Sequence, residues 1–80
     1  MSKKDKELKK LLQQKTLSSK EAVRLLELDG WVLDSKKSGS SHQQFVHPIK
    51  KGKTTVPAGR KTLPAETRKD ILIQAGLLGE

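Results

Sequence analysis

The chain has 80 residues, no cysteine and a formal net charge of +8, with Trp31 and Phe45 as its only aromatic residues. This length fits one small domain with a thin core and a short tail. The lack of cysteine excludes a disulfide framework and a thiolate metal site. No apolar run approaches the roughly 20 residues that a membrane-spanning helix needs, and no apolar stretch follows the lysine-rich start as in a signal peptide. We therefore expect a cytoplasmic protein with no membrane partner.

Residues 1–17 are rich in lysine and low in complexity. Leu8, Leu11 and Leu12 fall at helical spacing, but an isolated helix of this length is only marginally stable in water. We predict a flexible or partly helical N-terminal extension over 1–17, followed by a single domain over 18–80.

The first secure helix is predicted to begin at Ser18. Ser18 and Glu21 have the spacing of a capping box, in which each side chain bonds to the other residue's backbone N–H. Gly30 is suited to end the helix because glycine adopts the left-handed conformation there. The buried stripe of this helix is predicted to consist of Ala22, Leu25 and Leu26.

Three short strands are predicted next, at 31–34, 41–47 and 54–56, joined by a turn at 38–40 and a hairpin tip at 50–53. Alternation along the middle strand places His42, Gln44 and Val46 on one face, and Gln43, Phe45 and His47 on the other. Short connections favour an antiparallel meander.

A second helix is predicted from Pro64 to Gly76, with an apolar face made by Ile71, Leu72 and Ala75. The order is therefore helix, strand, strand, strand, helix. We expect an α+β fold in which two helices cover one face of a three-stranded antiparallel sheet.

The positive charge is concentrated in residues 35–61, which contain cations and no acid. Such a stretch produces a field that attracts a polyanion such as RNA. An alternative is that the lysines only protect a hairpin edge from aggregation. The candidate RNA-binding residues are Lys36, Lys37, Lys50, Lys51, Lys53, Arg60 and Lys61.

The two histidines, His42 and His47, are expected on opposite faces of the middle strand, so they cannot share a metal ion. No carboxylate lies in 35–61 to complete such a site, and we expect neither a metal nor a cofactor. If Phe45 packs on the helices, His42 faces solvent among the lysines. A neutral imidazole near pH 7 can act as a general base, although a histidine there can also simply contact a phosphate. His47 is predicted to have a structural role.

Several motifs of the chain occur together in a known family. They are the Asp29-Gly30-Trp31 triplet, the His-Gln-Gln-Phe-Val-His-Pro stretch over 42–48 and the Ile-Leu-Ile-Gln-Ala-Gly-Leu ending over 71–77. In this order and at this compact spacing, the chain resembles the HicA toxin family over residues 18–78.

The resemblance implies a double-stranded-RNA-binding-domain-like fold and a toxin of a bacterial toxin–antitoxin pair. Such toxins are endoribonucleases that cut mRNA, and the family's catalytic histidine corresponds to His42. The implied partner is a HicB-like antitoxin that covers the His42 face. Operator DNA would be contacted only indirectly, through the antitoxin.

The chain departs from the family pattern in three places. An additional serine stands between the glycine turn and His42, Ala58-Gly59 replaces a histidine found in many relatives, and the 1–17 extension is longer than usual. A non-catalytic RNA-binding module of the same fold therefore remains an alternative. A DNA-binding domain that places its second helix in the major groove is disfavoured, because residues 62–80 carry a net charge of −1.

Overall fold

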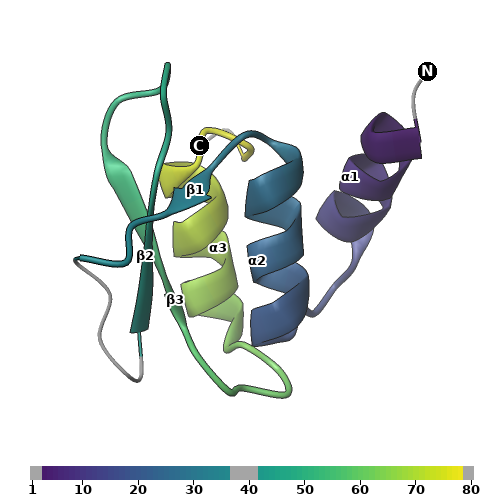
Figure 1. Cartoon of the computed structure of the whole chain (residues 1–80). Helices are drawn as coiled ribbons and strands as arrows, with labels where there is room; N and C mark the ends of the chain where they lie inside the picture. The colour runs from purple at the N-terminus through teal and green to yellow at the C-terminus, as the bar shows by residue number, and fades with distance from the viewer. Residues whose placement is uncertain (1–2, 37–41, 79–80) are drawn as a thin grey trace.

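The computed structural model describes residues 3–36 and 42–78. Lys37 and the turn expected at 38–40 lie outside the described residues. The structure confirms the predicted α+β fold, which is preceded by one helix at the N-terminal end of the chain (Figure 1). The elements in chain order are α1 (Lys3–Gln13), α2 (Ser19–Leu28), β1 (Val32–Leu33), β2 (His42–Val46), β3 (Lys53–Pro57) and α3 (Ala65–Gln74).

The three strands form an antiparallel sheet in the order β1-β2-β3, and α2 and α3 cover one of its faces (Figure 1). Phe45 pairs with Thr54 across β2 and β3, and both side chains are buried against the helices. His42 pairs with Pro57, and its side chain is exposed. The predicted alternation along β2 is therefore confirmed, and it defines an open face of the sheet.

Helix α2 has the ends that the sequence predicts. The Ser18 hydroxyl accepts from the Glu21 N–H at 3.1 Å, and the Glu21 carboxylate accepts from the Ser18 N–H at 3.0 Å. At the other end, Gly30 has a φ of +97°. The Trp31 N–H donates to the Leu26 carbonyl at 2.9 Å, which completes a Schellman motif. Because Trp31 takes part in this cap, β1 begins one residue later than expected, at Val32.

Helix α3 begins at Ala65, with Pro64 as its N-cap rather than its first residue. The predicted apolar side chains of Ile71, Leu72 and Ala75 are all buried. These residues pack on the sheet together with α2, so a core of few large side chains holds both helices in place.

Helix α1 lies against α2, on the side away from the sheet (Figure 1). Leu11 is only 7% exposed and joins the main core cluster. The Arg24 guanidinium donates to the Glu7 carboxylate at 2.8 and 3.1 Å, and this hydrogen bond lowers the pKa of Glu7 and raises the pKa of Arg24. Because both groups are exposed, apolar contact contributes more to the docking of α1 than this ion pair does.

A polar cluster at the end of α2, which we call the Asp29 junction, comprises Asp29, Trp31, His47 and Lys50. The Asp29 carboxylate accepts from the Lys50 ammonium at 2.6 Å and from the Trp31 indole N–H at 3.1 Å. The His47 Nδ1 accepts from the backbone N–H groups of residues 49 and 50 at 3.0 Å each. The His47 Nε2 therefore carries the proton and donates to the Asp29 carbonyl at 2.8 Å.

Gly30 is required at this junction for two separate reasons. Its φ of +97° disfavours any side chain, and an added Cβ would lie 2.9 Å from the His47 Nε2. Gly52 has a similar φ of +90°, but an added Cβ there would meet nothing within 4 Å. The two glycines therefore have similar φ angles and differ mainly in what an added Cβ would contact.

We predict that Gly30→Ala destabilises the protein clearly more than Gly52→Ala does. The Gly52 variant should lose roughly 1–2 kcal/mol from backbone strain alone. The Gly30 variant should lose about 1 kcal/mol more, because the His47 ring must move away from the Asp29 carbonyl. Urea unfolding measures the free energy of unfolding of each variant. Equal destabilisation by the two substitutions would show that the His47 ring does not restrict the space beside Gly30.

Candidate active site and nucleic-acid interface

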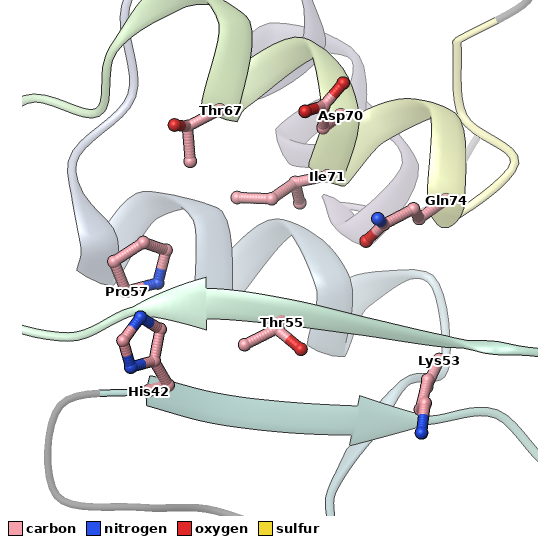
Figure 2. A pocket seen from close by; sticks show the side chains of 8 residues that line it. All are labelled: His42, Lys53, Thr55, Pro57, Thr67, Asp70, Ile71 and Gln74. Atoms are coloured by element: carbon pink, nitrogen blue, oxygen red, sulfur yellow. The ribbon is translucent and has the colours of Figure 1, made fainter.

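A groove of about 440 Å³ runs between β3, the outer strand of the sheet, and α3 (Figure 2). This volume lies within the usual range of ligand pockets, roughly 300–1,000 Å³. The sheet side contributes exposed side chains of β2 and β3, and the helix side contributes one face of α3. The lining residues are His42, Lys53, Thr55, Pro57, Thr67, Asp70, Ile71 and Gln74.

His42 is the first residue of β2, and its imidazole lies at one end of the groove beside Pro57 (Figure 2). The backbone of Pro57 is itself fixed, because its carbonyl accepts from the Ser19 hydroxyl at the start of α2. The same hydroxyl accepts from the Arg60 N–H at 2.9 Å. The strand end opposite His42 is therefore attached to a buried serine of the core.

Of the predicted RNA-binding cations, the structure places Lys53 in the groove with His42, at the opposite end (Figure 2). Lys36 follows β1, Lys51 lies at the hairpin tip, and Arg60 and Lys61 lie between β3 and α3; all four are exposed. They surround the sheet on several sides rather than forming one row. Their RNA contacts remain a prediction, as do those of Lys37.

Lys50 makes contacts within the fold that its position in the basic stretch 35–61 did not predict. Its ammonium donates to the Asp29 carboxylate at 2.6 Å and to the Ala75 carbonyl at 3.0 Å. One side chain therefore joins the hairpin to the ends of α2 and α3. His47 lies at the same junction, with its ring 5.2 Å from that of Trp31, in agreement with its predicted structural role.

Sequence reasoning did not single out the residues that α3 contributes to the groove. Thr67, Asp70 and Gln74 fall at positions i, i+3 and i+7, which lie on one face of a helix. That spacing was the only available signal, and on its own it is typical of an ordinary solvated helix face.

Within residues 3–36 and 42–78, no three or more His, Cys, Asp or Glu side chains gather as a metal site would require. Across these same residues, no helix is both long enough and apolar enough to cross a membrane.

Taken together, the fold and the groove define a small basic α+β domain in which one face of a three-stranded sheet is left open beside a histidine. Comparison with protein families narrows this class. A family model described as "HicA toxin of bacterial toxin-antitoxin" matches residues 19–77. The chain belongs to the HicA toxin family, so it is a toxin whose partner is a cognate antitoxin. No curated protein matches the chain.

We predict that Lys50→Met lowers the free energy of unfolding by about 1–2 kcal/mol, because Asp29 loses its cation and the Ala75 carbonyl loses a donor. Lys51→Met is the matched control, since Lys51 is exposed and has no ion pair within the described residues. The control should change stability by less than about 0.5 kcal/mol. Urea denaturation of both variants makes the comparison, and equal stabilities would contradict the structural role of Lys50.

Proposed function

We propose that this toxin is a metal-independent endoribonuclease that cuts mRNA, with His42 as its general base and general acid. One observation carries the proposal: an exposed histidine and a lysine, His42 and Lys53, line the same groove, which runs along the β3 edge of the sheet beside α3. Membership of the HicA family supports it, because the family resemblance implies ribonuclease toxins.

The proposed reaction needs no group from outside the protein and the RNA. The His42 imidazole takes the proton of a ribose 2′-hydroxyl, and the 2′-oxygen attacks the adjacent phosphorus. The bond from phosphorus to the 5′-oxygen breaks, and the leaving oxygen takes a proton from the imidazolium, directly or through water. General acid–base assistance of this kind contributes about 10²–10⁴-fold to a rate.

Lys53 lines the same groove as His42 but at its other end, four residues along β3 from the Pro57 that pairs with His42, so its ammonium suits a neighbouring phosphate of the bound RNA. The other predicted cations would bind flanking phosphates and fix the RNA strand. These are Lys36, Lys37, Lys50, Lys51, Arg60 and Lys61.

We predict that His42→Ala lowers RNA cleavage by at least about 100-fold while RNA binding changes little. The wild-type products, formed in EDTA, should carry 2′,3′-cyclic phosphate and 5′-hydroxyl ends. Gel mapping of a labelled RNA measures cleavage, and fluorescence anisotropy measures binding.

Two results would overturn the nuclease proposal. If His42→Ala cuts as fast as the wild type, His42 is not the acid–base group. If the wild-type protein binds RNA but leaves it intact, the chain is a non-catalytic RNA-binding module. Growth arrest on expression, lost in His42→Ala, gives the same distinction in cells.

For the cognate antitoxin, we propose a HicB-like protein that covers the His42 face and that alone contacts operator DNA. Val32 and Val46 pair across β1 and β2 on this open face, where they are 58% and 37% exposed. Val46 also pairs with Lys53 of the groove. Apolar side chains beside a cation suit a partner surface with both apolar and acidic groups.

We predict that Lys53→Glu weakens both RNA binding and antitoxin binding roughly tenfold, because one face serves both partners. Lys69→Glu makes the same charge change on α3, outside the groove lining, and should leave antitoxin affinity nearly unchanged. Calorimetric titration of the antitoxin and anisotropy with RNA provide the two affinities. Loss of only one of them in Lys53→Glu would show that the partners use different faces.

A further inference from the structure

The two walls of the groove differ in their chemistry. The sheet wall carries His42 and Lys53, which suit a phosphate. The α3 wall carries Asp70 and Gln74, whose exposed side chains lie one helical turn apart (Figure 2). Within the described residues, neither side chain takes part in a hydrogen bond or ion pair. The fold therefore does not use these polar groups for its own stability.

Asp70 limits what the α3 wall can bind. Its carboxylate repels phosphate, so the RNA backbone is held by the sheet wall and a different part of the nucleotide must face α3. A carboxylate accepts hydrogen bonds only, which selects a group that presents N–H donors. Between the walls, Ile71 is buried in the core and closes the floor of the groove, whereas Pro57 is half-buried and offers apolar surface to the flat face of a nucleobase.

Only one standard base suits a carboxylate that accepts two parallel hydrogen bonds. The Watson–Crick edge of guanine presents two adjacent donors, N1–H and N2–H, followed by the O6 acceptor. Asp70 can accept both donors, and the amide of Gln74 can donate to O6. Adenine and cytosine would direct a ring-nitrogen acceptor at the carboxylate, and uracil has a single donor between two carbonyls.

We propose that the α3 wall is a guanine-binding subsite, in which Asp70 and Gln74 read the base of the nucleotide next to the cleaved bond. This inference rests on the proposed ribonuclease function, since it assigns the cleaved phosphate next to that base to His42. The toxin then prefers to cut RNA beside guanine.

The test uses four uridine-rich RNAs that differ only in one central base. The wild-type protein should cut next to central guanine roughly tenfold faster than next to any other base. Asp70→Asn replaces one acceptor oxygen with a donor, so the guanine preference should fall below about twofold. Glu66→Gln removes an acid from the same helix outside the groove lining, and it should keep the full preference.

Binding to His42→Ala, measured by anisotropy with the same four RNAs, separates this inference from the nuclease proposal. Equal cleavage of all four RNAs, or a guanine preference that survives Asp70→Asn, would overturn the subsite and leave the nuclease intact. If no RNA is cut, the nuclease proposal fails and binding decides the subsite alone. Tighter binding of the guanine RNA that is lost in the His42→Ala/Asp70→Asn double variant then supports it, and equal affinities overturn it.

Discussion

The orientation of the candidate active site depends on the register of β2, which is set by its five residue pairs with β3 and by the burial of Phe45. The His47 ring joins the end of β2 to the end of α2, and its other nitrogen accepts two backbone N–H groups of the following turn. A strand that slips by one residue turns every side chain to the opposite face. By fixing the residue after β2, the bond from His47 to the Asp29 carbonyl adds to the pairing that holds Phe45 in the core and His42 on the open face.

The two histidines therefore have opposite roles although they are five residues apart on one short segment. His47 is enclosed by the Asp29 junction, where Trp31 contacts its ring and Lys50 joins the same carboxylate to the end of α3. His42 stands at the far end of the strand, in the groove. The groups that hold the fold together are thus separated from the group proposed to carry the chemistry, and one can be altered without the other.

Local signals in the sequence were sufficient for most of the fold. The Ser18 cap, the glycine after each core helix and the alternation along 42–46 all depend on neighbouring residues, and each was predicted correctly. Features that depend on distant contacts were not predictable in this way. The contacts of Lys50 with Asp29 and Ala75 could not be predicted, because these partners are 21 and 25 residues away in the chain. The docking of Leu11 on the core likewise required the position of α2.

At the site itself, the residues of the α3 wall could not be predicted from the sequence either, because their role depends on a distant contact. Thr67, Asp70 and Gln74 look like an ordinary polar helix face until α3 is placed beside the outer strand of the sheet. The +7 charge of residues 35–61 points to the sheet and gives no indication of a contribution from α3. Of the cations in this stretch, Lys53 lines the groove, and Asp70 lies in the opposite wall. The proposed subsite uses this difference, because a basic surface attracts any polyanion whereas a carboxylate accepts only a donor. Asp70 and Lys53 are 17 residues apart in the chain, and only the fold places them in the two walls of one groove.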